Sequence, residues 1–224
     1  MKTLSLLAVA AALASGVSAH YRFTSLIANG QTTGAYQYVR QNSNMNSPVT
    51  SVTSNDIRCN TGAGSGAGTQ TATVAAGSTV GFQMDQAVYH AGPVAVYLGK
   101  APSTAASWDG SGANWFKIYE IGAVITPSSI TFPTDKATFT FSLPRSIPSG
   151  EYLLRIEQIG LHSAGAPQWY ISCAQLNITG GGSANPAKVS IPGYVSASDP
   201  GLTVNIYYPI PTSYKVPGPA VFSG

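Results

Sequence analysis

Apolar and polar residues alternate with a period of two in several short segments of the chain. These segments cover residues 78–84, 94–98, 137–143, 152–156, 168–178 and 202–207. In the third of them Phe139, Phe141 and Leu143 share one face, while threonine and serine residues share the other. Such alternation is typical of a strand that has one side in a core. The pattern therefore predicts a strand at each of these places.

Turn sequences separate the predicted strands, among them Pro148-Ser149-Gly150 and a run of three glycines at 180–182. No stretch has a sustained helical period. Short strands at this density predict an all-β fold, specifically an immunoglobulin-like or fibronectin-like antiparallel β-sandwich. The long stretches 28–56 and 100–130 are expected to be surface loops, where binding surfaces usually lie.

The first 19 residues have the features of a secretory signal peptide. A basic start (Lys2) is followed by an apolar run over 4–14 and by the small residues 17–19, after which signal peptidase would cut. The apolar run is short of the roughly 20 residues that span a bilayer. We therefore expect a secreted, extracellular protein with one domain, residues 20–224, that begins at His20. A terminal histidine offers its α-amine and a ring nitrogen, so it can chelate a metal.

Composition narrows the partners of this domain. Charged residues make up only 8% of the chain, the net charge is +3, and the basic residues are scattered, so neither nucleic acid nor a membrane is an expected partner. In an oxidising compartment Cys59 and Cys173 are expected to form a disulfide, with thiol metal ligands as the alternative. Asn177 begins an N-glycosylation acceptor sequence, Asn-Ile-Thr.

The chain contains three histidines, and all of them lie at the mature terminus or near strand ends. His20 would be the first residue, His90 lies in a turn before the strand 94–98, and His162 follows the strand that begins at 152. Each of them taken singly is equally consistent with an ordinary surface residue. Their shared position in a chain with few ionisable groups makes them candidate ligands.

Gln168 and Tyr170 are two residues apart on a predicted strand, so both side chains project to the same side. Cys173 has the opposite parity and can carry the disulfide on the other face. The Gln168–Tyr170 pair could belong to a functional site, or it could satisfy hydrogen bonds within a core. Parity alone leaves both interpretations open.

Several motifs resemble one known family. They are His20 after the predicted leader, HAGPVAVYL (90–98), YLLRIE (152–157), LHSA (161–164), QWYISCAQ (168–175), and the tail segments DPG (199–201), NIY (205–207) and PGP (217–219). Together they are similar to the fungal lytic polysaccharide monooxygenases of auxiliary activity family 9. The resemblance covers essentially the whole mature chain. The segment between His162 and Gln168 is shorter than the family pattern, and the region before Cys59 lacks an insertion that some members carry.

The resemblance implies one copper ion in a histidine brace. The α-amine and ring of His20 and the ring of His90 would bind it, with the Tyr170 hydroxyl near an axial position and His162 and Gln168 hydrogen bonding around it. Nitrogen ligands in a tetragonal arrangement suit Cu(II). An α-amine with a pKa of about 7.7–8.0 can lose its proton to a metal near neutral pH. Zinc is the alternative metal, but it usually adds a carboxylate or thiolate, and no acidic residue adjoins these histidines in the sequence.

The resemblance also implies a reaction, in which a monomeric oxidoreductase cleaves cellulose or a related β-glucan at carbon 1 or carbon 4. The co-substrate would be hydrogen peroxide or dioxygen. Electrons would come from a small-molecule reductant or from an extracellular electron-donor enzyme. Tyr207, followed by Tyr214 and Tyr38, is the candidate aromatic platform for the polysaccharide.

Two other classes of protein remain as alternatives. A glycoside hydrolase needs two carboxylates across the scissile bond. The chain has only eight acidic residues and no paired motif, and Glu157 is expected to pair with Arg155 on one strand face. A non-catalytic extracellular binder of carbohydrate or copper would need no set like His162, Gln168 and Tyr170, so their presence favours an enzyme.

Overall fold

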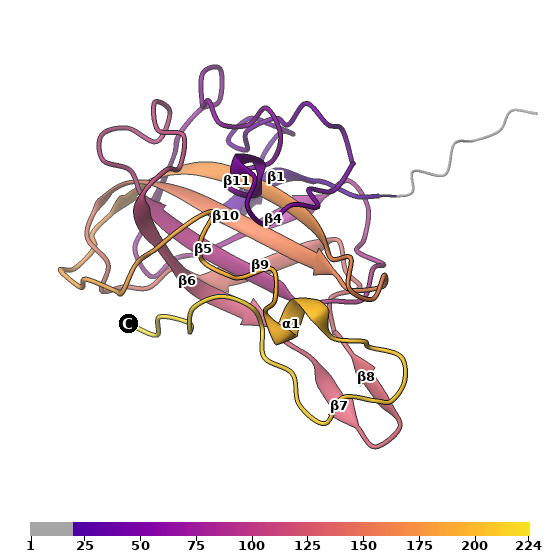
Figure 1. Cartoon of the computed structure of the whole chain (residues 1–224). Helices are drawn as coiled ribbons and strands as arrows, with labels where there is room; N and C mark the ends of the chain where they lie inside the picture. Colours follow the sequence, from indigo (N-terminus) through magenta and orange to yellow (C-terminus); the bar gives the residue numbers. More distant parts are fainter. Residues whose placement is uncertain (1–19) are drawn as a thin grey trace, which may run out of the picture.

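Two β-sheets pack face to face in the computed structural model, which describes residues 20–224 (Figure 1). The first sheet has the strand order β2-β1-β4-β9, and the second has the order β12-β6-β5-β10-β11-β3. All paired strands are antiparallel except β3, which runs parallel to β11. The predicted leader, residues 1–19, lies outside the described residues.

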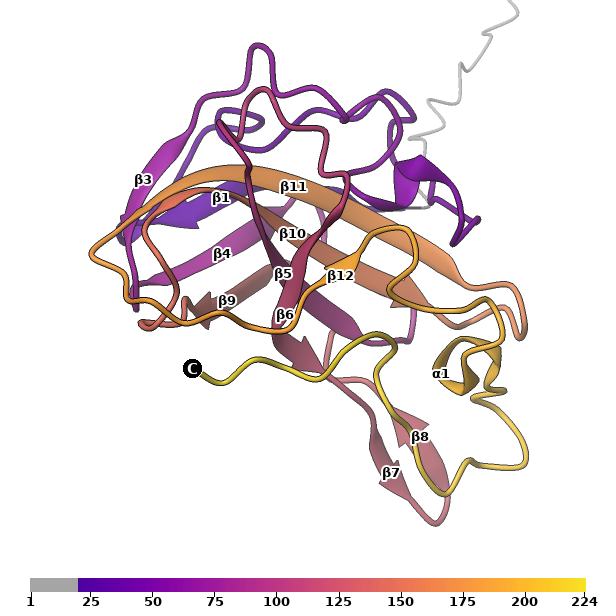
Figure 2. The same cartoon turned by 60° about the vertical axis from the view of Figure 1, so that its left-hand side comes forward.

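The strand bounds follow the chain from one sheet to the other. They are β1 Phe23–Ala28, β2 Gln31–Thr32, β3 Ala72–Ala75, β4 Thr79–Met84, β5 Val94–Lys100, β6 Ala113–Ile121, β9 Thr138–Ser142, β10 Gly150–Gly160, β11 Gln168–Thr179 and β12 Val189–Ser190. A separate hairpin of β7 Val124–Thr126 and β8 Ser129–Thr131 projects beyond the sandwich, close to the short helix α1 Pro200–Thr203 (Figures 1 and 2). One 3₁₀ turn, Asn55–Ile57, lies in a loop. No helix within residues 20–224 is long and apolar enough to span a membrane.

The all-β sandwich is confirmed, and five of the six predicted strands correspond to β4, β5, β9, β10 and β11. The prediction for 202–207 is wrong. There Asp199 accepts a hydrogen bond from the Gly201 amide and caps α1, and Asn205 then accepts one from the Tyr207 amide in a turn. Cap and turn bonds of this kind compete with a strand ladder.

The prediction that 100–130 is loop is also wrong in part, because β6 occupies nine of its residues. The pairing register shifts between Val96 and Tyr97 where β5 meets β6. Consecutive residues of β6, Trp115 and Phe116, are both buried, so the strand lacks the alternation that marks a half-buried strand. The stretch 28–56 is loop apart from the two residues of β2 and isolated bridges at Val39 and Val49.

The six-stranded sheet is buried on both faces. Alternate residues of β11, such as Tyr170 and Ala174, face the core between the sheets, while Trp169 and Cys173 face a second core. Long loops from the first half of the chain lie over this outer face in Figure 2 and cover the second core. The predicted disulfide between Cys59 and Cys173 is formed there and ties one of these loops to β11.

Buried arginines fasten the loops to the sheet. Arg40 is 1% exposed and donates hydrogen bonds to the Gln175 side chain and to the carbonyls of four loop residues, Ala63, Gly64, Ala105 and Trp108. Burial lowers the pKa of Arg40 to about 10, so it stays a cation at neutral pH. Each donor is thus matched by an acceptor, as a buried charge requires.

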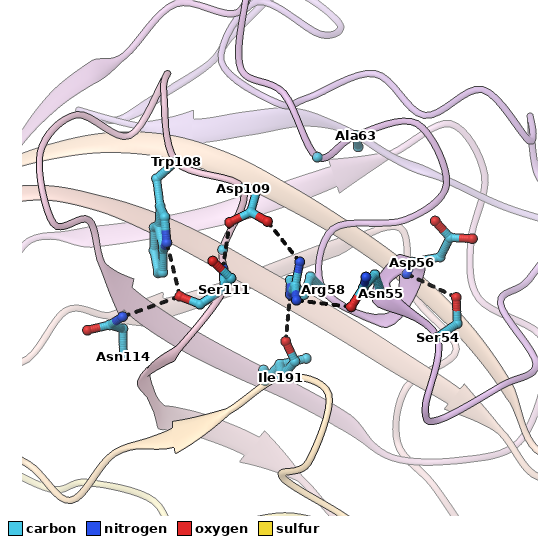
Figure 3. A network of polar contacts seen from close by, with 12 residues as sticks. Ser54, Asn55, Asp56, Arg58, Ala63, Trp108, Asp109, Ser111, Asn114 and Ile191 are labelled. Carbon is cyan, nitrogen blue, oxygen red and sulfur yellow. Dashed lines mark hydrogen bonds and ion pairs between the residues drawn. The ribbon is translucent and has the colours of Figure 1, made fainter.

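Arg58 makes a comparable junction nearer the surface (Figure 3). Its guanidinium forms an ion pair with Asp109 at 3.0 Å and donates to the Ile191 carbonyl at 2.8 Å and to the Asn55 side chain at 3.0 Å. Arg155 and Glu157, both wholly buried on β10, form the expected ion pair at 2.8 Å. These contacts join segments that are more than 50 residues apart in the sequence.

Replacing Arg40 with methionine should test this role, because the apolar chain keeps the volume but leaves the buried carbonyls without donors. We expect Arg40→Met to lower the free energy of unfolding by about 3 kcal/mol or more. The exposed Arg145→Met control should change it by less than about 0.5 kcal/mol. Chemical denaturation of both variants gives the values, and equal midpoints would contradict the assignment.

Candidate metal centre

Strand register brings the predicted site residues to one end of the sandwich. Strand β10 lies between β5 and β11 and is antiparallel to both, with Gln158 opposite Val94 and Gly160 opposite Gln168. The end of β10 therefore lies beside the starts of β5 and β11. His162 follows β10, His90 precedes β5, and Gln168 and Tyr170 begin β11.

His20 reaches the same end because it precedes β1, whose first residue, Phe23, pairs with Met84 at the end of β4. Its carbonyl accepts hydrogen bonds from Gln86 at 2.7 Å and from Asn46 at 3.2 Å. The loop before His90 and the loop after Arg40 thereby hold the main chain of His20. This residue is thus fixed from two sides.

The rings of His20, His90 and Tyr170 form a nearly equilateral triangle. Their centroids are 5.8 Å apart for His20 and His90, and 5.7 Å apart for Tyr170 and each histidine. Tyr170 is buried, whereas both histidines are only half-buried. The structure therefore brings together three of the predicted site residues around a small space at the surface.

His90 has the protonation state that a metal ligand needs. Burial, with smaller contributions from His162 and His20, lowers its pKa to about 4, so the imidazole is neutral at neutral pH. Its Nε2 atom is buried and makes no hydrogen bond to another described residue. A neutral imidazole with an uncommitted buried nitrogen offers a lone pair to a metal.

His162 and Gln168 lie directly beside this triangle. The His162 ring stacks on the His90 ring with centroids 3.8 Å apart, and the Tyr170 hydroxyl donates to Gln168 Oε1 at 2.7 Å. Gly160 permits the stack, because a Cβ there would lie 3.1 Å from His162 Nδ1. Burial, together with His20, lowers the pKa of His162. The hydrogen bond between Gln168 and Tyr170 agrees with their shared strand face.

The three candidate platform tyrosines have different surroundings. Tyr207 is 58% exposed, and its hydroxyl donates to the His162 carbonyl at 2.7 Å. Tyr214 is half-buried against Phe132 and donates to the Gly201 carbonyl, and Tyr38 is half-buried against the core. Of the three, Tyr207 is thus tied to the end of the sandwich that carries the histidines. The candidate glycosylation residue, Asn177, is half-buried on β11.

The residues present fit a metal held mainly by nitrogen. Two imidazoles on opposite sides of a metal, with bonds of about 2 Å and ring nitrogens about 1.1 Å from the ring centre, have centroids roughly 6 Å apart. The 5.8 Å between His20 and His90 agrees with this value. No group of three or more His, Cys, Asp or Glu side chains within residues 20–224 is arranged to hold a metal. The third nitrogen of the predicted set is not a side chain but the α-amine of His20.

Sequence reasoning missed the residues that support the two histidines. Tyr21 packs on Tyr170 with ring centroids 4.4 Å apart, and Gln158, on β10, is wholly buried. The available signal was a polar residue at position 158, which has the parity of the buried Leu154 and Ile156. Gln86 and Asn46 lie in loops, where no pattern marks them.

Comparisons with known proteins agree with this geometry. A family model described as Auxiliary Activity family 9 (formerly GH61) matches residues 20–214. The chain is 55% identical over 233 residues to the AA9 family lytic polysaccharide monooxygenase H of Malbranchea cinnamomea, with 100% of both chains covered. It is 47% identical over 227 residues to the AA9 family lytic polysaccharide monooxygenase C of Emericella nidulans, with 98% of each covered.

A solved structure also matches. The crystal structure of a cellulose-active polysaccharide monooxygenase from M. thermophila superposes with a TM-score of 0.83 at 34% identity. The match covers 92% of this chain and 100% of that chain. The sandwich and its loops therefore follow those of an experimentally determined relative.

The hydrogen bond from Tyr207 to the His162 carbonyl leads to a prediction about local mobility. Tyr207→Phe keeps the ring but removes a bond worth about 1 kcal/mol, so amide exchange in the turn 163–166 should accelerate several-fold. Tyr208→Phe, which alters the neighbouring and 83% exposed tyrosine, is the control and should leave this exchange unchanged. Equal exchange in wild type and Tyr207→Phe would show that the bond does not hold the turn.

Proposed function

The chain belongs to Auxiliary Activity family 9, the family of lytic polysaccharide monooxygenases, and we propose that it cleaves β-1,4-glucan chains of cellulose by copper-dependent oxidation. The observation that carries this proposal is the triangle of His20, His90 and Tyr170 rings at one exposed end of the sandwich. A nitrogen-rich set of this kind suits Cu(II) better than the carboxylate- or thiolate-containing sets typical of zinc.

The ligand set depends on processing of the chain. Cleavage after Ala19 would give a secreted protein whose first residue is His20, and the family match also begins at this residue. The α-amine and ring of His20 and the ring of His90 would then hold the ion, with the Tyr170 hydroxyl at the third corner. Copper bound there would supply one-electron chemistry between Cu(II) and Cu(I) that activates dioxygen or hydrogen peroxide.

The surrounding residues orient the reacting oxygen and its protons. Because the Tyr170 proton is donated to Gln168 Oε1, the amide of Gln168 is oriented with its Nε2 hydrogens available to a co-substrate. The lowered pKa of His162 keeps its imidazole neutral at neutral pH, so it can accept a proton or return one. The stack on His90 fixes where that exchange takes place.

Substrate recognition is expected on the surface around these rings. Tyr207 presents an exposed ring beside His162 and is the first candidate for stacking on a glucosyl unit, with Tyr214 and Tyr38 as the others. Oxidation at carbon 1 or carbon 4 would then break the chain. We propose that a monomer acts with an external reductant or with an extracellular electron-donor enzyme.

A glycoside hydrolase is disfavoured by the surroundings of Glu157. This carboxylate is wholly buried, pairs with Arg155 at 2.8 Å and accepts a hydrogen bond from Tyr194 at 2.7 Å. It is thus committed to the core. A non-catalytic binder remains a distinguishable outcome of the experiments below.

Product analysis tests the proposed activity. Copper-loaded protein, amorphous cellulose and ascorbate should yield oxidised oligosaccharides detectable by mass spectrometry. His162→Ala and Gln168→Ala should keep copper but lose at least about 90% of turnover, since a general acid–base group typically contributes 10²–10⁴-fold. Copper binding without oxidised products would indicate a binder, and unoxidised products would indicate a hydrolase.

The N-terminus provides a sharper test of the ligands. One extra residue before His20 turns the α-amine into a peptide nitrogen, whose lone pair is delocalised into the amide. The extended protein should fold normally around the Cys59–Cys173 disulfide, yet bind copper at least about 100-fold more weakly. His90→Ala should weaken binding as strongly. Protein processed after Ala19, verified by N-terminal sequencing, is the control, and unchanged affinity in the extended protein would overturn the ligand set.

A further inference from the structure

Gln158 is a polar residue in the most buried part of the fold. It lies on β10, is 0% exposed, and is paired across the sheet with Val94 on one side and Tyr170 on the other. Its side chain has the parity of Leu154 and Ile156, which belong to the core between the two sheets. A buried amide at such a position requires partners for its donor and its acceptor.

Those partners belong to the two arms of the candidate metal centre. Gln158 Oε1 accepts a hydrogen bond from the Tyr21 hydroxyl at 2.5 Å, and Gln158 Nε2 donates to the His90 carbonyl at 3.0 Å. Tyr21 is the residue directly after His20. One side chain thus links the neighbour of the first histidine to the main chain of the second.

Packing leaves the first arm little freedom to move independently. Tyr21 is 1% exposed, and its ring packs between Tyr170, at 4.4 Å, and Tyr89, at 5.3 Å between centroids. Because the ring is enclosed in this way, its hydroxyl fixes where the following and preceding backbone lies. Burial raises the pKa of Tyr21, so the hydroxyl keeps its proton and remains a donor.

The second arm is pressed against β10. Gly92 has φ +154°, and a Cβ there would lie 1.8 Å from the Ile159 carbonyl oxygen and 3.3 Å from Gln158 Nε2. Only glycine therefore allows the turn that carries His90 to approach β10 closely enough for the amide to reach the His90 carbonyl.

We propose that Gln158 is a positioning residue that sets the separation of the His20 and His90 imidazoles by holding both arms from one side chain. This role deepens the proposed function and rests on it. Gln158 touches neither the rings nor the expected substrate surface. It acts by fixing Tyr21 and the His90 main chain, and it thereby keeps the two rings at the distance that a single metal ion requires.

Gln158→Leu tests the proposal, since leucine retains most of the volume but can bond neither partner. In protein processed after Ala19, copper affinity should fall at least about tenfold, the equivalent of losing roughly 1.4 kcal/mol of binding free energy. The Cu(II) paramagnetic resonance spectrum should change as well. Tyr21→Phe, which removes only the first bond and is the milder change for folding, should give a smaller effect in the same direction.

Gln175→Leu is the matched control. Gln175 is also wholly buried, accepts from Arg40 and donates to the Thr69 carbonyl at 2.8 Å, but it lies on the opposite face of the six-stranded sheet. It should lose stability in thermal unfolding while its copper affinity and Cu(II) spectrum stay unchanged. If Gln158→Leu and Tyr21→Phe both keep the wild-type affinity and spectrum, or if Gln175→Leu changes them equally, the proposal is overturned.

A copper-free measurement separates this proposal from the function on which it rests. Imidazole proton–nitrogen NMR spectra of the metal-free protein should show shifts of both His20 and His90 in Gln158→Leu. Tyr21→Phe should shift His20 more than His90. A wild-type protein that binds no copper would refute the proposed function, while these spectra would still decide whether Gln158 positions the rings. Unshifted resonances in both variants would refute the positioning role alone.

Discussion

The antiparallel register of β10 between β5 and β11 is the constraint on which the site depends. It places the end of one strand beside the starts of two others, so side chains from residues 90, 162 and 170 meet although the chain separates them widely. A one-residue slip would turn Tyr170 and Gln158 to the other face of the sheet. The site is therefore a consequence of strand pairing, and the loops only complete it.

Register is secure because the central strands are buried on both faces. One face packs on the four-stranded sheet, and the other lies beneath loops that Arg40, Arg58 and the Cys59–Cys173 disulfide hold down. These loops bury polar main chain, and the arginines satisfy it with several donors from a single side chain. The same loops deliver Asn46 to the carbonyl of His20. Stability of the outer core and placement of the first histidine thus have a common origin.

The sequence predicted what depends on local pattern and missed what depends on pairing. Regular alternation located β4, β5, β9, β10 and β11, and strand parity placed Gln168 with Tyr170. Strand β6 escaped because a register shift buries adjacent residues, and 202–207 failed because side-chain caps replace the ladder. The bonds of Gln158 to Tyr21 and to the His90 carbonyl span 137 and 68 residues, so no local pattern could reveal them.

The central claim is that three nitrogens, two of them from His20, surround one metal ion. Cu(II) paramagnetic resonance on protein in which only histidine carries nitrogen-15 tests it directly, because the α-amine and both ring nitrogens are then labelled. The account predicts couplings to three labelled nitrogens that persist in His162→Ala. Coupling to fewer than three, or couplings that disappear when His162 is replaced, would contradict it.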